Sequence, residues 1–161
     1  MANQKHVRRL KQGVKQWNEW EMQHPGKYPD LYGADLSGLD LNRVDLRKAD
    51  LNEANLREAD LSEARLVEID LSEAKLWRAK LERARLWEVK LDGANLREAD
   101  LNRVLLRGVD LKGAKLEKTK LRRAMFFFAE LDGADLRGAD LREAKMWGSV
   151  ILCGRICTGR I

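Results

Sequence analysis

The chain has 161 residues, a mass of 18.5 kDa and 35% charged residues, a length typical of one domain. Its longest run without a charged residue, from Met146 to Gly154, has nine residues and is far shorter than the ~20 that cross a bilayer, which argues against a membrane protein. We expect a soluble, cytoplasmic protein in which Cys153 and Cys157 are reduced thiols.

The net charge of +5 is concentrated at the N-terminus. Residues 1 to 30 hold six of the 31 Lys and Arg and three of the 26 Asp and Glu, which leaves 25 basic and 23 acidic residues in the remainder. This near balance makes a nucleic-acid partner an unfavoured interpretation.

Residues 3 to 23 have the pattern of one amphipathic helix. Val7, Leu10, Val14 and Trp17 share one face of a helical wheel, and Lys and Arg occupy the rest. The helix should end at His24, because Pro25 disfavours helical backbone in the residue before it. Such a helix can cap the open end of a repeat protein. The alternative is a basic helix that lies on a membrane surface.

From Leu31 to Met146 an apolar residue recurs every five positions without insertion or deletion, which gives 24 repeat centres. A step of five turns about 140° on an α-helix, so these side chains would form no stripe there. In extended backbone, residues two apart share a face, so Ala34 and Leu36 point inward together and the following residues turn a corner. The pattern predicts an all-β solenoid whose coils share hydrogen bonds and one core.

The segments A-D-L-S-E-A-R-L and G-A-D-L-R-G-A-D-L resemble the pentapeptide repeat family over roughly residues 30 to 161. The resemblance implies a right-handed quadrilateral β-helix with 20 residues per coil, hence about six coils here. The N-terminal segment also resembles the capping helix of bacterial, often cyanobacterial, members. We therefore expect a capping helix and linker at 1–29 and a β-helix at 30–161.

Residues 20 apart should stack, so charge signs can be compared along columns. Asp60, Lys80, Asp100, Lys120 and Asp140 alternate in sign, which favours the correct register. In contrast, Arg83, Arg103 and Arg123 stack like charges beside Arg122 and Arg142. This basic patch is the candidate for weak nucleic-acid binding.

One side of the rod should carry outward apolar residues among arginines. Large exposed apolar patches usually mark binding surfaces, and Trp with Arg is typical of interface hot spots. The alternative is that the N-terminal helix or the last residues cover this side. The candidate partner-binding residues are Val67, Arg85, Trp87, Leu105, Met125, Phe127 and Trp147, with Arg65 and Arg107 among them.

No catalytic, metal or cofactor site is apparent. His6 and His24 both lie in the N-terminal segment, no zinc-binding or phosphate-binding motif occurs, and the carboxylates sit in solvated columns. We expect a non-enzymatic protein-interaction or scaffold module with an unidentified protein partner. The family resemblance also raises a DNA-mimicking gyrase-binding protein as an alternative. This chain departs from that pattern, because Lys75, Lys80, Arg85 and Lys90 stand where a mimic needs acid.

The C-terminal end is apolar and has no apparent cap. We expect an uncovered strand edge there to pair with a second copy, giving a head-to-head homodimer through residues 146 to 161. The apolar side is the rival dimer interface. The candidate dimerisation residues are Val150, Ile151, Leu152, Ile156 and Ile161.

The inward frame makes a direct prediction. Burying one Leu side chain is worth roughly 1.5 to 3 kcal/mol, against a net stability of ~5 to 15 kcal/mol for a domain. Leu86→Lys should therefore unfold the central coils, whereas Glu88→Lys should barely change the melting temperature. Equal melting temperatures for the two variants would refute the assigned frame.

Overall fold

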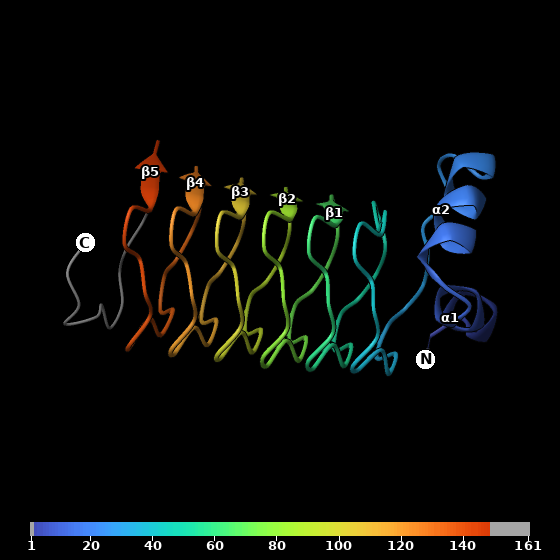
Figure 1. The fold of residues 1–161 in the computed structure, drawn as a ribbon, viewed down its shortest axis with the longest axis horizontal. Coiled ribbons are helices and arrows are strands. Elements are labelled where there is room, and N and C mark those ends of the chain that lie inside the picture. Colours follow the sequence, from blue (N-terminus) through green and yellow to red (C-terminus); the bar gives the residue numbers. More distant parts are fainter. Residues whose placement is uncertain (1, 149–161) are drawn as a thin grey trace.

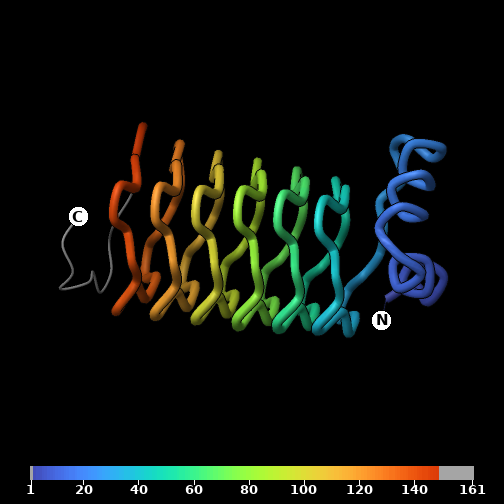
Figure 2. Tube along the Cα trace, viewed as in Figure 1, coloured from blue at the N-terminus to red at the C-terminus, as the bar shows by residue number. Residues whose placement is uncertain are grey.

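A computed structural model describes residues 2 to 148. Two helices, α1 (Gln4–Lys11) and α2 (Val14–Gln23), stand at one end of a rod-shaped parallel β-solenoid (Figures 1 and 2). Within this range, neither helix is long and apolar enough to cross a bilayer.

The N-terminal segment forms two helices, so the prediction of a single helix over residues 3 to 23 is wrong. The break is at Gly13, whose φ of 130° is disfavoured for residues with a side chain. The expected face survives the break, because Val7 and Leu10 of α1 and Trp17 and Trp20 of α2 are all buried. The predicted end is confirmed, since α2 finishes at Gln23 with His24 as its C-cap.

The solenoid has a register of 20 residues, as predicted. Its strands are β1 (Arg65–Val67), β2 (Arg85–Trp87), β3 (Leu105–Arg107), β4 (Met125–Phe127) and β5 (Lys145–Trp147). They form one parallel sheet in that order, and Leu66, Leu86 and Leu106 are successive partners. A bridge from Asp45 to Arg65 adds a level before β1.

Three more columns of single parallel bridges complete the coil. They begin with the pairs Asp30 and Asp50, Asp35 and Asn55, and Asp40 and Asp60. With the strand column, they give each coil four sides. Most corners are tight turns. In one of them, the Ala34 amide donates a 2.9 Å hydrogen bond to the Leu31 carbonyl. The residue two positions after each repeat centre has a positive φ at these corners, for example 58° at Glu53, which follows Leu51.

Only one side extends beyond single bridges into three-residue strands. Two residues after β1, β2 and β3 the inward side chains are Ile69, Val89 and Val109, whereas most other repeats have Ala at the equivalent position. Ala49, in the same column one level earlier, follows a tight turn and no strand. A larger inward side chain therefore follows three of the strands, whereas β4 is followed by Ala129.

The core runs along the rod axis. The repeat centres from Leu31 to Leu136 are at most 3% exposed, and Phe126 fits among them at 1%. The buried hydroxyl of Thr119 donates a 2.8 Å hydrogen bond to the Leu96 carbonyl, which removes the cost of burying it unpaired. The continuous apolar axis is what the five-residue period predicts.

Side chains of α2 close the backbone edge of the first coil. In the interior, the Arg65 amide donates to the Val44 carbonyl one coil earlier at 2.9 Å. Asp45 has no earlier coil, and its amide donates to Asn18 Oδ1 at 2.9 Å while its carbonyl accepts from Trp17 Nε1 at 2.7 Å. Asn18 Nδ2 also donates to the Arg43 carbonyl at 3.1 Å. Two side chains thus supply the hydrogen bonds that a preceding coil would make.

The α1 helix closes another part of the same edge. The Asp30 amide donates to His6 Nδ1 at 3.1 Å, and its carbonyl accepts from the Asn3 amide at 3.2 Å. The expected capping role of the N-terminal segment therefore extends to individual edge groups at Asp30, Arg43 and Asp45.

Glu21 is a buried carboxylic acid of α2, within the cap itself. It is 9% exposed, and its Oε1 has no hydrogen-bond partner among the described residues. Burial and the nearby carboxylate of Asp45 raise the pKa of Glu21 to about 7, although the Arg47 guanidinium acts in the opposite direction. The docked cap therefore favours the protonated form of Glu21.

This burial predicts a pH-dependent stability. The pKa of Glu21 is higher in the folded chain than in the unfolded one, so its contribution is complete below about pH 4.5 and is lost as pH rises to about 7. The shift corresponds to about 3 kcal/mol, at roughly 1.4 kcal/mol per pKa unit. Urea unfolding of the wild type and Glu21→Gln should show the variant gaining relative stability between pH 4.5 and 8. Parallel pH profiles would contradict this prediction.

Candidate protein-interaction face

The outward side chains of β1 to β5 form a surface that we call the strand face. In β1 to β4 the middle residue is buried in the core and the two outer residues point outward, whereas all three residues of β5 are exposed. The strands lie side by side along one edge of the rod (Figure 1). No outward residue of these strands is acidic. The apolar ones are Val67, Trp87, Leu105, Met125, Phe127 and Trp147, and the basic ones are Arg65, Arg85, Arg107 and Lys145.

The structure brings all seven candidate partner-binding residues onto this face. Most of the apolar ones are half-buried, because each packs against its neighbours in the next coils. Phe127 and Trp147 are partners in adjacent strands and stack with ring centroids 4.5 Å apart and planes 9° apart. Trp147 is 41% exposed, so the stack presents an aromatic surface to solvent. The helices lie at the end of the rod and leave the face uncovered (Figure 1).

Phe128 belongs to the same surface and was missed by the sequence analysis. It lies just after β4, is 64% exposed and has a φ of 52°, a region that bulky residues rarely adopt. The ring lies over Gly148 in the next coil, where an added Cβ would collide with it. Comparison of residues 20 apart could have identified Phe128, because Glu68, Glu88 and Gly108 occupy the equivalent positions in the earlier coils.

The half of the strand face nearest the cap contains a groove of about 330 Å³, which we call the strand-face groove. Its lining combines four basic residues and one acidic residue with two apolar ones. The residues are Arg47, Lys48, Arg65, Val67, Glu68, Arg85 and Trp87. The lining of the groove is therefore mostly basic, with apolar side chains at Val67 and Trp87.

Several polar groups of this region lack a partner within the described chain. No ion pair involves Arg85 or Arg107 in residues 2 to 148, although both are exposed. Arg107 is the register partner of Trp87. The buried indole N–H of Trp87 has no hydrogen-bond acceptor there. Tryptophan N–H groups usually find an acceptor when buried.

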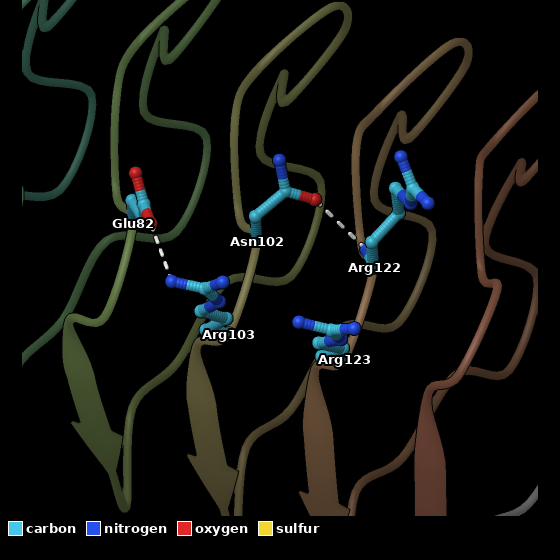
Figure 3. A pocket seen from close by; sticks show the side chains of 5 residues that line it. All are labelled: Glu82, Asn102, Arg103, Arg122 and Arg123. Carbon is cyan, nitrogen blue, oxygen red and sulfur yellow. Dashed lines mark hydrogen bonds and ion pairs between the residues drawn. The ribbon is translucent and has the colours of Figure 1, made fainter.

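The predicted basic patch lies around another corner of the coil. Arg103 and Arg123 lie one above the other and, with Glu82, Asn102 and Arg122, line a pocket of about 270 Å³ (Figure 3). Arg103 Nη1 lies 3.7 Å from Glu82 Oε1, and the Arg122 amide donates to Asn102 Oδ1 at 2.9 Å.

Carboxylates neutralise most of this patch. Arg123 Nε lies 2.8 Å from Glu143 Oε2 and lowers the pKa of that carboxyl group. Arg142 Nη2 lies 2.6 Å from Asp140 Oδ2, and this hydrogen-bonded pair lowers the pKa of Asp140 to about 2. These carboxylates remain charged at neutral pH, so the arginines do not form an open anion site.

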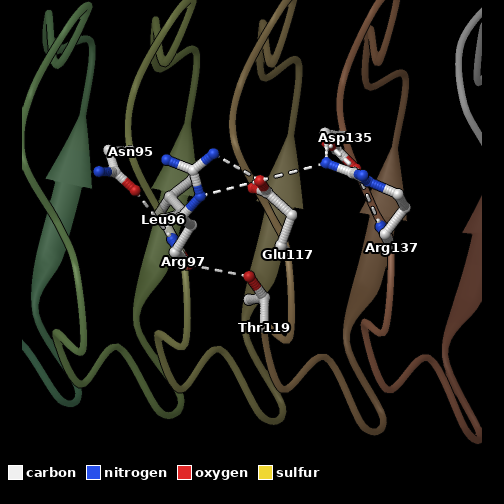
Figure 4. A network of polar contacts seen from close by, with 7 residues as sticks. All are labelled: Asn95, Leu96, Arg97, Glu117, Thr119, Asp135 and Arg137. Carbon is white, nitrogen blue, oxygen red and sulfur yellow. Dashed lines mark hydrogen bonds and ion pairs between the residues drawn. The ribbon is translucent and has the colours of Figure 1, made fainter.

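The side opposite the strand face is mainly a paired polar surface. Glu117 Oε1 accepts from Arg97 Nε at 2.8 Å and lies 3.7 Å from Arg137 Nη2 (Figure 4). The one tryptophan on this side of the described rod, Trp77, lies beneath Arg78, whose guanidinium carbon is 4.2 Å from the ring centroid. Arg78 Nε in turn donates to Glu98 at 2.9 Å.

The remaining predicted sites have different outcomes. Among residues 2 to 148, no group of three or more His, Cys, Asp or Glu side chains could hold a metal ion. The dimerisation candidates Val150, Ile151, Leu152, Ile156 and Ile161 lie outside the described residues, as do Cys153 and Cys157. Their predicted roles stay predictions.

Comparisons with known proteins agree with the repeat geometry. The family model for pentapeptide repeats matches in 8 copies, over residues 30–66, 69–108 and 105–142. HetL, a pentapeptide repeat protein involved in heterocyst differentiation regulation from the cyanobacterium Nostoc sp., is 35% identical with a TM-score of 0.54. That match covers 74% of this chain and 60% of HetL. No curated protein sequence gives a match.

Two further solved structures belong to the same kind of protein. A pentapeptide repeat protein from the Arabidopsis thaliana thylakoid lumen is 25% identical, with 66% of this chain and 71% of that chain covered and a TM-score of 0.32. Rfr23 from the cyanobacterium Cyanothece is 29% identical, with 76% and 60% covered and a TM-score of 0.23.

The aromatic stack makes a measurable prediction. A stacked aromatic pair contributes about 0.5 to 1.5 kcal/mol beyond the burial of its area. A double-mutant cycle of Phe127→Leu and Trp147→Leu, measured by urea unfolding, should give a coupling energy in that range. Trp87→Leu with Trp147→Leu is the control pair, because the two residues lie three coils apart and should be additive within about 0.5 kcal/mol. Equal coupling in both cycles would contradict the stack.

Proposed function

Because the chain belongs to the pentapeptide repeat family, we propose that it is a non-enzymatic protein-interaction module whose binding surface is the strand face. The observation that carries this proposal is the composition of that face. Its ten outward strand residues, two from each of five strands, are six apolar and four basic residues with no acid. Exposed apolar surface of this size and kind usually marks a site of association.

The energetics of interfaces support the same surface. Binding energy concentrates in a few residues, with Trp, Tyr and Arg enriched among them. The strand face offers Trp87 and Trp147 beside Arg85 and Arg107, and Phe128 adds an exposed aromatic ring. A partner that covers these rings would gain apolar burial of about 25 cal/mol per Å² before the costs of association.

The similarity to HetL is consistent with a regulatory interaction. HetL is described as taking part in the regulation of heterocyst differentiation. This chain spans 60% of HetL, so a shared process is a proposal and no more.

The charge distribution disfavours the two alternatives. A mimic of DNA requires a continuous acidic surface, whereas Lys75, Lys80 and Lys90 are exposed on other sides of the rod. Direct nucleic-acid binding requires open cations, whereas the arginines of the basic patch lie beside carboxylates.

Affinity capture from a lysate of the producing organism tests the proposal. We expect the wild-type chain to retain a partner protein that Trp87→Glu and Phe128→Gly each weaken at least tenfold, as hot-spot residues do. Glycine adopts the positive φ of residue 128 readily, so Phe128→Gly removes the ring while preserving the turn.

Trp77→Glu is the matched control, because it makes the same substitution half a coil away on the opposite side. Circular dichroism should confirm that all three variants remain folded. Capture that Trp77→Glu reduces as strongly as Trp87→Glu would refute the strand face as the binding surface.

A further inference from the structure

Resting on the proposed function, we propose that the strand-face groove binds an extended acidic peptide segment whose carboxylates alternate with apolar side chains. The lining of the groove includes Arg47 and Arg85 together with the apolar side chains of Val67 and Trp87. This inference names the chemistry of the partner, which the interaction role alone leaves open.

The charges of the groove favour an acidic ligand, because its lining has one cation without an ion pair in residues 2 to 148. Its only carboxylate, Glu68, lies 3.7 Å from Lys48 Nζ. Arg47 and Arg65 share Asp45 at 2.8 and 3.7 Å, and Arg85 has no ion pair within the described residues. Three of the four lining cations therefore lie near Asp45 or Glu68, and Arg85 is the lining cation left for an outside carboxylate. Arginine also presents paired donors in a planar fork, which suits a carboxylate.

The unpaired cations continue along the face. Arg107 follows Trp87 in the next strand, and Lys145 is exposed in β5. From β1 to β5 the coils advance four steps of ~4.8 Å, or roughly 19 Å. An extended peptide rises ~3.3 Å per residue, so about six residues span the face. Its side chains alternate in direction, so one set faces the rod and the other faces solvent or the walls.

The lining of the groove favours a peptide over a nucleic acid. It has one aromatic ring, Trp87, beside Val67, whereas single-stranded nucleic acids stack successive bases on several aromatic platforms.

The same charges disfavour a second copy of this chain on the face. In a two-fold dimer the same surface is used twice, so two faces without outward acids in their strands would bring cations together. Like charges juxtaposed across an interface oppose association. An acidic partner meets the opposite condition.

The test uses the full chain and a fluorescein-labelled octapeptide in which Glu alternates with Phe. Fluorescence anisotropy should show saturable binding that weakens as salt is raised. Arg85→Glu and Trp87→Ala should each raise the dissociation constant at least tenfold. Lys75→Glu should change it less than twofold, because this exposed cation lies half a coil away and makes the same change in net charge.

Control ligands separate the two components of the site. An octapeptide of alternating Lys and Phe should not bind, and one of alternating Glu and Ser should bind at least tenfold more weakly. Absence of binding, equal binding of the Lys peptide, or equal effects of Arg85→Glu and Lys75→Glu would overturn the inference. Tighter binding of decathymidylate, or self-association that Arg85→Glu abolishes in sedimentation, would assign the face to another occupant and also overturn it.

The two proposals can fail separately. If lysate capture depends on Trp87 and Phe128 but the acidic peptide does not bind, the inferred chemistry is wrong and the interaction role stands. If the peptide binds through Arg85 but capture is indifferent to the strand face, the proposed function is wrong and the groove's preference for acidic peptides stands.

Discussion

The structure depends on parallel backbone hydrogen bonds that link residues one coil apart. Each coil exchanges backbone hydrogen bonds with its neighbours. The Arg65 amide, for example, donates to the Val44 carbonyl one coil earlier. Because this pairing is uniform, inward side chains stack into one apolar axis and outward side chains stack into columns. The fold places strong demands on the inward positions and few on the outward ones. The sides of the rod are thus free to carry different chemistry.

That freedom explains how one side can become an interaction face without a loop or a cleft. On most sides, opposite charges stand near each other, as Lys80 and Asp60 do at 3.5 Å. Such exposed pairs contribute little to stability, but each pair neutralises its own two charges. The five strands of the strand face carry no outward acid, and Arg85 and Arg107 have no ion pair within the described residues. The absence of acidic residues from its strands distinguishes this face as much as the presence of basic and apolar ones.

The amino-acid sequence predicts the solenoid well because the five-residue period reports directly on which side chains are buried. Even Thr119, which places a hydroxyl group at a small inward position, finds the backbone acceptor that its burial requires. The helix break was not predicted, since the apolar pattern continues through Gly13 and only the backbone reveals its positive φ. Column comparison identified Trp87 and Phe127 but did not include Phe128, which is 64% exposed. The neutralisation of Arg123 by Glu143 depends on side-chain rotamers, which spacing alone does not determine.

The position of the cap also bears on the order in which the chain acquires structure during synthesis. Translation delivers α1 and α2 before any coil, so Trp17 and Asn18 are already available when the segment that contains Asp45 emerges. The first coil can then form against a finished surface, and each later coil against the one before it. A nascent rod built in this direction has its earlier edge closed throughout, and only the growing edge is open to other chains.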